Sequence, residues 1–262
     1  MNGSETSDFY DGCADAYFEK TFFHDMSGER SRLARLLKPG ARILDAGSGS
    51  CRDTVAFREM GFEVVPTDPS EGMRRIASER LGIDVLPFGF LDMAFDEEFD
   101  GVWASASLLH LHPDELPGAL DAVHRALRSG GAFYCSFKEG SFEGIREGRW
   151  YTDMDETRLR NLLASCGFRP EDVRTDTGPG GILWVSAVSI RQRYDGPTVS
   201  GSHEIQQPEG PQEEDGRKGR HHLHRRSGQG RRVRYIQAQE DNRHQGGSHP
   251  RDERARDALQ GR

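Results

Sequence analysis

Cysteine is scarce in this chain, and long apolar runs are missing. The four cysteines lie far apart and lack the spacing of metal ligands, so we predict no metal site. Scattered cysteines of this kind are typical of reduced thiols in the cytoplasm rather than of a disulfide framework. No apolar run is long enough to span a membrane, and the polar stretch 1–5 lacks the pattern of a secretory signal. We therefore predict a cytoplasmic protein with no membrane partner.

A surplus of positive charge is missing as well. The formal net charge is -8, which disfavours a chain built mainly to bind nucleic acid or a membrane surface. The charge is uneven, because residues 192–262 carry 14 Lys and Arg against 11 Asp and Glu, which leaves -11 for residues 1–191. The mildly basic end is a weak indication of an anionic partner, and a solvated end is the simpler interpretation.

Large apolar side chains are nearly missing after residue 191. A segment of this composition cannot bury enough apolar surface to offset its ordering entropy, so we predict that residues 192–262 form a low-complexity, disordered tail. The tail contains the run His221–His224, which suits weak metal binding, and Arg231–Arg234, which suits RNA or DNA phosphates. Neither run indicates catalysis. Residues 1–191 are long enough to fold around one core.

Apolar runs alternate with amphipathic stretches through residues 1–191. We predict strands at 42–45, 63–67, 84–88, 101–105, 132–137 and 181–190. Between them we predict helices at 31–38, 51–60, 68–80, 113–127 and 155–165, after a partly helical aromatic-rich stretch at 8–24. This alternation predicts an α/β fold with a doubly wound, mostly parallel sheet.

A glycine turn follows the first strand, in the run Ile43–Asp53, and is typical of nucleotide-binding α/β sheets. Asp45 ends the strand immediately before the glycines Gly47 and Gly49. A carboxylate at this position repels a pyrophosphate but suits a ligand with positive charge, such as S-adenosylmethionine. Asp68 ends the second strand, where it is placed to accept hydrogen bonds from ribose hydroxyls of either that cofactor or NAD.

These motifs, together with Phe99–Trp103 and Leu127–Gly131, resemble class I S-adenosylmethionine-dependent methyltransferases over about residues 8–190. The stretches Tyr10–Tyr17, Ala106–His110 and Phe142–Thr152 resemble more narrowly the small bacterial methyltransferases of the tellurite-resistance and small-molecule type. The resemblance implies a seven-stranded Rossmann-like sheet with helices on both faces. It also implies a lid segment at 1–30, a cofactor domain at 31–191, and methyl transfer to a small molecule.

The resemblance assigns roles to individual residues. Gly47 and Gly49 would let the backbone approach the methionine part of the cofactor, and Asp68 would hold the ribose. The other implied cofactor contacts are Asp45, Phe90 beside the adenine, Tyr10 and Tyr17 in the lid, and Ala104 and Ser105 at the methyl-transfer centre. Two positions depart from the pattern: Cys51 replaces the third glycine, and Gly89 stands where an acid often accepts from the adenine amino group. We expect Asp92 or a backbone group to substitute at the second.

The candidate general base is His110, just past the fourth strand, needed only if the nucleophile must lose a proton. A packed or capping histidine is the simpler interpretation of that position. Arg149, Trp150 and Tyr151 are the candidate substrate residues, because an arginine beside two aromatics suits an anionic or planar acceptor. A surface arginine beside core aromatics explains them as well.

Three alternatives to a small-molecule methyltransferase remain open at this point. The first is an RNA or protein methyltransferase that holds its substrate through the tail, which the acidic domain disfavours. The second is a cofactor-binding protein without turnover, which the departures at Cys51 and Gly89 would permit. The third is an NAD-dependent dehydrogenase. Asp45 before the glycines and the lack of a Tyr-x-x-x-Lys base pattern disfavour it.

Overall fold

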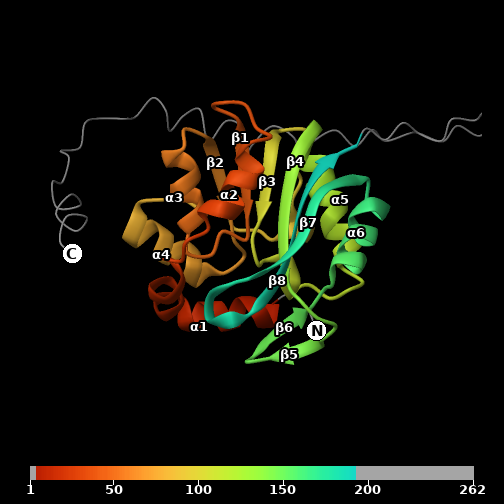
Figure 1. Cartoon of the computed structure of the whole chain (residues 1–262). Coiled ribbons are helices and arrows are strands. Elements are labelled where there is room, and N and C mark those ends of the chain that lie inside the picture. Colours follow the sequence, from red (N-terminus) through yellow and green to blue (C-terminus); the bar gives the residue numbers. More distant parts are fainter. Residues whose placement is uncertain (1–3, 193–262) are drawn as a thin grey trace, which may run out of the picture. The chain divides into compact units, whose positions relative to one another are not determined.

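The computed structural model of the chain describes residues 4–192, which belong to one compact unit (Figure 1). The helices are α1 (Ser4–Thr21), α2 (Ser27–Ala34), α3 (Arg52–Glu59), α4 (Glu71–Leu81), α5 (Leu116–Ala126) and α6 (Glu156–Ser165), with short 3-10 helices η1 (Phe90–Asp92), η2 (Leu108–His110) and η3 (Pro179–Gly181). The strands are β1 (Arg42–Ala46), β2 (Glu63–Thr67), β3 (Phe99–Ala104), β4 (Leu127–Lys138), β5 (Glu143–Arg146), β6 (Arg149–Thr152), β7 (Phe168–Thr177) and β8 (Leu183–Arg191). The predicted tail lies outside the described residues, apart from Gln192.

The main sheet has six strands in the order β2-β1-β3-β4-β8-β7. Strands β2, β1, β3 and β4 pair in parallel, whereas β8 runs antiparallel to both β4 and β7. The order reverses on either side of β1, which places a ligand crevice at the carboxyl ends of β1 and β3. The predicted doubly wound, mostly parallel α/β fold is therefore confirmed.

The predicted count of seven strands is wrong, because the stretch 84–88 does not form a strand. It makes a single bridge between Leu86 and Thr67, closed by bonds from Leu86 N to Pro66 O and from Asp68 N to Leu86 O, both 3.0 Å. The next residue, Pro87, has no N–H to extend the ladder. Phe88 N donates a hydrogen bond to Leu86 O instead.

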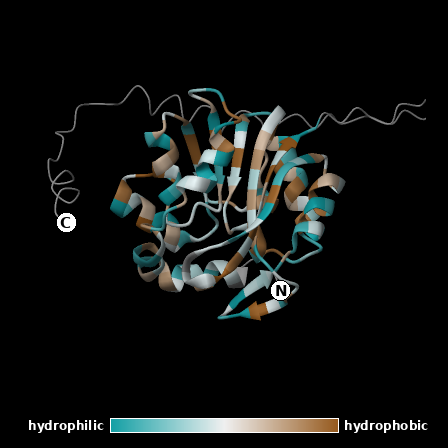
Figure 2. Ribbon diagram, viewed as in Figure 1, coloured by the Kyte–Doolittle hydropathy of each residue, from teal (hydrophilic) through white to brown (hydrophobic). Residues whose placement is uncertain are grey.

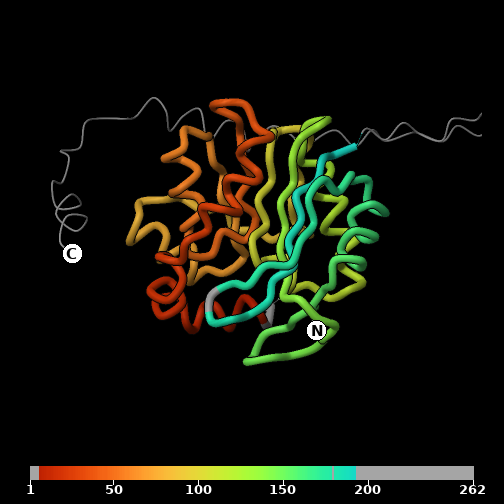
Figure 3. Tube along the Cα trace, in the orientation of Figure 1, coloured from red at the N-terminus to blue at the C-terminus, as the bar shows by residue number. Residues whose placement is uncertain are grey.

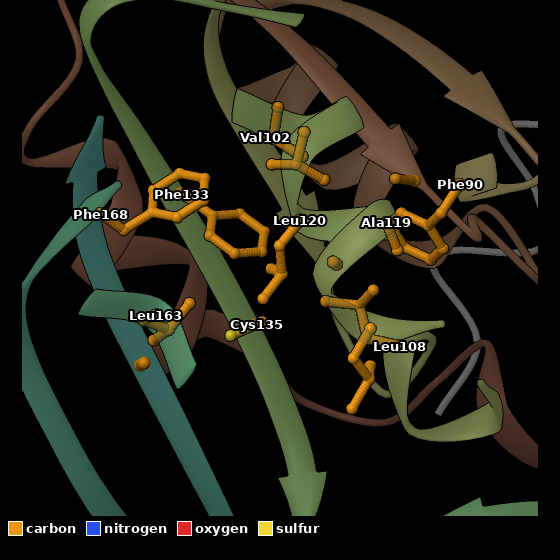
Figure 4. Close-up of a cluster of buried hydrophobic side chains, with 14 of the residues drawn as sticks. Phe90, Val102, Leu108, Ala119, Leu120, Phe133, Cys135, Leu163 and Phe168 are labelled. Carbon is orange, nitrogen blue, oxygen red and sulfur yellow. The ribbon is translucent and has the colours of Figure 1, made fainter. Parts of the chain in front are cut away.

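Side chains alternate between the two faces of the sheet, as the period of a strand requires. Val102 and Ala104 of β3 belong to the core cluster that also contains apolar residues of α5 and α6, whereas Trp103 belongs to the cluster shared with α2 and α3. Figure 4 shows the first cluster, with Phe133, Leu120 and Leu163 pointing toward one another. Hydrophobic residues gather on the central strands and hydrophilic ones on the outer helices (Figure 2). Helices thus cover both faces, as predicted.

Local signals at the ends of helices explain most of the observed boundaries. Ser70 accepts a hydrogen bond from Met73 N and starts α4, which ends at Gly82 in the left-handed conformation. Asp155 caps α6 in the same way, by accepting from Arg158 N. Helix α5 stops at Ala126 rather than at residue 127, because Leu127 already begins β4.

Three strands were not predicted. Strand β7 alternates polar and partly buried residues and gives only a weak apolar pattern, while β5 and β6 form a separate two-stranded sheet. The hairpin lies beside α1 in the trace of Figure 3, at the end of the sheet toward which β4 runs. No helix among residues 4–192 is long and apolar enough to cross a membrane.

Candidate active site

The glycine turn after β1 is held to the end of β2 by its backbone. Gly47 N and Ser48 N both donate to Thr67 O at 2.9 Å. Gly47 has φ +75°, and a Cβ built there would lie 2.5 Å from the Cβ of Ser107. The chain's own packing thus requires glycine at this position, whatever ligand approaches the turn. Ser107 completes the contact by donating from Oγ to Ala46 O at 2.8 Å.

Cys51 keeps the left-handed backbone of the glycine that it replaces. Its φ is 58°, yet its side chain is fully buried in a cluster with Val55, Ala77 and Ile83. Its sulfur also contacts the turn itself, because Cys51 Sγ lies 3.6 Å from Ser48 Oγ. Burial raises the pKa of this thiol to about 12.

The carboxylate of Asp68 links the end of β2 to the glycine turn and to the start of α4. Its Oδ2 accepts from Gly49 N at 2.8 Å, and its Oδ1 accepts from Ser70 N at 2.9 Å. The residue is 8% exposed, and burial raises the pKa of its carboxyl to about 6 despite both backbone hydrogen bonds. The remaining lone pairs of this carboxylate suit the two hydroxyls of a ribose.

Asp45 lies beneath the turn rather than on its surface. It is 3% exposed and accepts from Thr54 Oγ1 at 2.5 Å. Burial and then the neighbouring Asp53 raise the pKa of Asp45 to about 7. Asp53 itself is held by Arg30 and Arg52, both at 2.6 Å. A positively charged ligand would favour the ionised form of Asp45 through space.

Helix α1 covers this end of the sheet, and one contact with α4 positions it. Asp11 Oδ1 accepts from Ser70 Oγ at 2.6 Å and from Gly72 N at 2.8 Å. A Cβ at Gly72 would lie 2.8 Å from the Cα of Asp11 and 3.2 Å from the Cβ of Ala14. Glycine at position 72 therefore permits the two helices to meet.

The two predicted lid tyrosines lie together on α1. The ring centroids of Tyr10 and Tyr17 are 5.0 Å apart with the rings edge to face. A Cβ at Gly49 would lie 3.6 Å from Tyr17 Cε1, so this tyrosine covers the glycine turn. The structure thus brings Tyr17, Gly49 and Asp68 into one place, as the resemblance implies.

His110 is linked to the lid by Tyr10. Its Nδ1 lies 2.8 Å from Trp150 O, and its Nε2 lies 2.9 Å from Tyr10 Oη. Because a carbonyl only accepts, Nδ1 carries the proton and the unprotonated Nε2 accepts from the tyrosine hydroxyl. Burial lowers the pKa of His110 to about 4, so the imidazole is neutral at pH 7.

The three candidate substrate residues lie on β6, and each has a different environment. Arg149 Nη1 donates to Tyr10 Oη at 3.2 Å, and its guanidinium lies over the Phe9 ring at 4.4 Å. Tyr151 is 4% exposed, with its ring centroid 5.0 Å from that of His110. Trp150 stacks on His112 at 3.6 Å, so its ring faces away from this group.

The remaining predicted contacts are divided between the core and the site. Ala104 is fully buried and Ser105 partly buried at the end of β3, directly before the turn that carries Ser107. Phe90 is 6% exposed, and its ring points toward Ala119 in the core (Figure 4). The structure thus places the Phe90 ring as support for η1, so a contact of this ring with adenine stays a prediction.

Sequence reasoning missed Ser107, Asp11 and Gly72. The residues Ser107 and Gly47 are 60 positions apart, and only the pairing of β1 with β3 brings them together. Asp11 gave a usable signal, because an acid beside the lid tyrosine is the type of side chain that caps a helix start. Gly72 gave none, since a glycine near the start of a helix has no pattern that predicts a crossing helix.

The residues present fit a cofactor with positive charge and a ribose. Two buried carboxylates, Asp45 and Asp68, lie at the ends of adjacent strands, where a phosphate would be repelled. The glycine turn presents backbone at Gly47 and Gly49, and the Tyr17 side chain covers Gly49. Among residues 4–192, no group of three or more His, Cys, Asp or Glu could hold a metal ion.

Comparisons with known proteins agree with this geometry. The family described as "Methyltransferase domain" matches residues 43–131. An uncharacterised methyltransferase of Synechocystis sp. (strain PCC 6803) is 33% identical over 182 residues, covering 62% of this chain and 80% of that protein. An uncharacterised methyltransferase of Staphylococcus carnosus (strain TM300) is 34% identical over 90 residues, or 34% of this chain, but the match spans only 44% of its length.

A solved structure has a similar fold. It is the Burkholderia thailandensis 1,6-didemethyltoxoflavin-N1-methyltransferase with bound 1,6-didemethyltoxoflavin and S-adenosylhomocysteine, at a TM-score of 0.61 and 25% identity. The similarity covers 73% of this chain and 87% of that one.

Proposed function

This chain belongs to the class I S-adenosylmethionine-dependent methyltransferases, and we propose from that membership that it methylates a small-molecule acceptor. The comparisons confirm the predicted family and cofactor, and they exclude the alternative of an NAD-dependent dehydrogenase. The narrower likeness to tellurite-resistance enzymes stays a prediction. The roles of individual site residues are proposals argued from the geometry described above.

The bound cofactor supplies an electrophilic methyl group on a sulfonium. The protein's part is to position the nucleophile and to exclude water. We assign Asp68 and Gly49 to the ribose and methionine side, Asp45 to through-space stabilisation of positive charge, and Tyr17 to the cover. We also assign Ala104, which ends β3, and Ser105 after it to the methyl-transfer centre.

The observation that carries the proposal is the position of Asp68. One buried carboxylate receives backbone N–H groups from the glycine turn and from the start of α4, directly beneath the lid tyrosine Tyr17. The two backbone N–H groups use one lone pair on each oxygen, and the remaining lone pairs of the carboxylate suit hydroxyl donors. Binding of the ribose hydroxyls would explain why a carboxylate is buried at this position.

A small acceptor is supported by the closed lid and by the solved relative. Tyr10 of the lid bonds to His110 and Arg149, so the lid is held over the proposed acceptor side, which favours a compact molecule over a polymer. The ligand of the Burkholderia enzyme, 1,6-didemethyltoxoflavin, is also a small molecule.

Calorimetric titration with S-adenosylmethionine and S-adenosylhomocysteine tests the proposal. We expect micromolar binding that Asp68→Ala weakens by at least about tenfold, since a charged group typically contributes about 1.5–3 kcal/mol through its hydrogen bonds. Asp84→Ala is the matched control, because Asp84 is exposed and follows α4 outside the site. Binding of neither compound, or equal affinity in both variants, would contradict the proposal.

A further inference from the structure

Three cations from three different strands surround one buried ring. Lys138 Nζ lies 4.2 Å from the centre of the Tyr151 ring, Arg146 lies 5.3 Å from it, and Arg149 lies 5.4 Å from it. Lys138 ends β4, Arg146 ends β5 and Arg149 begins β6. We call Lys138, Arg146, Arg149 and Tyr151 the cationic wall.

Carboxylates neutralise the cationic wall only in part. Asp153 pairs with Arg146 at 2.9 Å, and the 76% exposed Glu147 pairs with Arg149 at 3.0 Å. Lys138 has no ion pair among residues 4–192. Burial and the two arginines lower the pKa of Lys138. An unpaired cation among like charges, partly shielded from water, favours the arrival of an anion.

The cationic wall contacts the candidate site through Tyr151 and Arg149. His110 packs against Tyr151 with ring centroids 5.0 Å apart, and Arg149 donates to the hydroxyl of Tyr10 in the lid. Lys138 lies on β4, whose Cys135 pairs with Ala104 at the end of β3. The buried acids Asp45 and Asp68 lie at the ends of β1 and β2 instead. The site is therefore acidic on the side of the cofactor and basic on the side of the acceptor.

We propose that the acceptor is a planar ring compound with an acidic hydroxyl, a phenol or enol, which binds as its oxyanion against the cationic wall. This inference rests on the proposed function. The rings of Phe9, Tyr10 and Tyr151 suit a planar molecule, and the cations suit the oxygen.

The charged and titratable groups that face this position come from each neighbouring element. They are Tyr10 and Tyr17 of α1, His110 of η2, Lys138 of β4, Arg146 of β5, Glu147 in the turn, Arg149 and Tyr151 of β6, and Asp153 after it.

An oxyanion acceptor changes what the reaction needs from the protein. The hydroxyl proton leaves to solvent before or during binding, and an oxygen lone pair then forms the bond to the methyl carbon. The carbon–sulfur bond breaks as this bond forms, and its electron pair stays on sulfur. No proton remains to be removed, so the neutral His110 acts as a positioning residue that holds Tyr10 through its Nε2.

The test uses 4-nitrophenol as the probe, with the full-length protein saturated with S-adenosylhomocysteine so that no turnover occurs. Absorbance of the phenolate gives the apparent pKa of the bound probe directly. We expect it to lie about one unit below the value in water, a tenfold preference for the anion. At a pH above the pKa of 4-nitrophenol, the uncharged analogue 4-nitroanisole should bind about tenfold more weakly than 4-nitrophenol does.

Variants of one lysine identify the source of the effect. Lys138→Met should remove about half of the shift, and Lys138→Arg should retain it, because arginine keeps the charge. Lys38→Met is the matched control, since the exposed Lys38 precedes the start of β1, whereas Lys138 ends the parallel strand β4. Calorimetry with S-adenosylhomocysteine should give the same affinity for all four proteins.

Several results would overturn the inference. They are an unchanged or raised pKa of the bound probe, equal effects of Lys138→Met and Lys38→Met, or no saturable binding of 4-nitrophenol by a protein that binds S-adenosylhomocysteine. Failure to bind S-adenosylhomocysteine would instead overturn the proposed function.

Discussion

Gly47 and Gly89 differ in whether the surrounding packing excludes a side chain. At Gly47 a Cβ would collide with Ser107 at 2.5 Å, so the fold itself excludes other residues. At Gly89 the backbone is extended, with φ -92° and ψ -170°, and a Cβ would meet only the Pro69 ring at 3.8 Å. Packing therefore does not require glycine at position 89.

The open space at Gly89 predicts that Gly89→Asp strengthens cofactor binding. An aspartate there would supply the acceptor for the adenine amino group that many relatives of this fold have, as the resemblance implies. One such hydrogen bond contributes about 0.5–1.5 kcal/mol, a two- to tenfold gain in affinity measured by calorimetry. Gly89→Ala adds the Cβ without the acceptor and should leave affinity unchanged. A gain in both variants would show that rigidity, not the hydrogen bond, is responsible.

The tautomer of His110 predicts different effects for two substitutions. His110→Gln can accept from the Tyr10 hydroxyl through its amide oxygen but cannot act as a base, so turnover of an acceptor found by screening should stay within about tenfold. His110→Ala loses that hydrogen bond and should lose more. A loss of about 100-fold or greater in His110→Gln would show that His110 is the general base predicted from the sequence.

At the scale of whole elements, the lid is the helix whose position determines the site. Helix α1 is kinked at Cys13 and rests on the start of α4 through Asp11, Ser70 and Gly72. Ion pairs from Asp15 and Glu19 to Arg75 and Arg80 add to this contact, but they are about half exposed and contribute little. Close backbone packing holds the lid more than charge does.

The close approach at Gly72 predicts that Gly72→Ala loosens the lid. Alanine favours a helix interior by up to about 1 kcal/mol over glycine, yet here its Cβ would meet the backbone of Asp11. We expect weaker binding of S-adenosylhomocysteine and faster proteolysis within α1. Gly118→Ala in α5 is the matched control, because its Cβ would only touch Leu91 at 3.6 Å. That variant should be more stable, with unchanged affinity. Unchanged proteolysis of α1 in Gly72→Ala would contradict this account of the lid.

At the scale of the whole molecule, the cofactor-free protein buries acidic groups that oppose its stability near neutral pH. Burial raises the pKa of Asp45 to about 7 and that of Asp68 to about 6, from the usual 3.8. A raised pKa in the folded state means that the folded protein binds the proton more tightly than the unfolded chain. The resulting stability is complete below about pH 4 and is lost as the pH rises toward 7.

This linkage predicts that Asp45→Asn flattens the fall in stability between pH 4 and pH 7. Asparagine can still accept from Thr54 but does not ionise, so the variant should be more stable than the natural protein at pH 7.5, by no more than about 4 kcal/mol. Denaturant unfolding of both proteins at pH 5 and pH 7.5 measures the effect. In Asp84→Asn, at an exposed site, the free energy of unfolding should change with pH as it does in the natural protein. Parallel slopes for all three would contradict the prediction.

Much of the architecture could be predicted from local patterns. The second strand was predicted with the bounds of β2, and the caps at Ser70 and Asp155 begin the helices expected there. The strand at 84–88 was predicted from its apolar residues, but Pro87 limits it to one bridge. Strand β7 and the β5–β6 hairpin were missed because their residues are mostly polar and form no apolar run, although each strand pairs with its neighbour along the chain.

The sequence by itself determined the order of the main helices and of the parallel strands, the family, and the positions of Asp45, Gly47, Gly49 and Asp68, because these depend on short-range periodicity and on motifs within a few residues. Only the tertiary structure decided that Gly47 meets Ser107, that Gly72 admits the lid, and that Lys138, Arg146 and Arg149 surround Tyr151. The physical reason is that burial, pKa and electrostatic potential depend on neighbours in space. Those neighbours are brought together by strand pairing and helix packing across the whole chain.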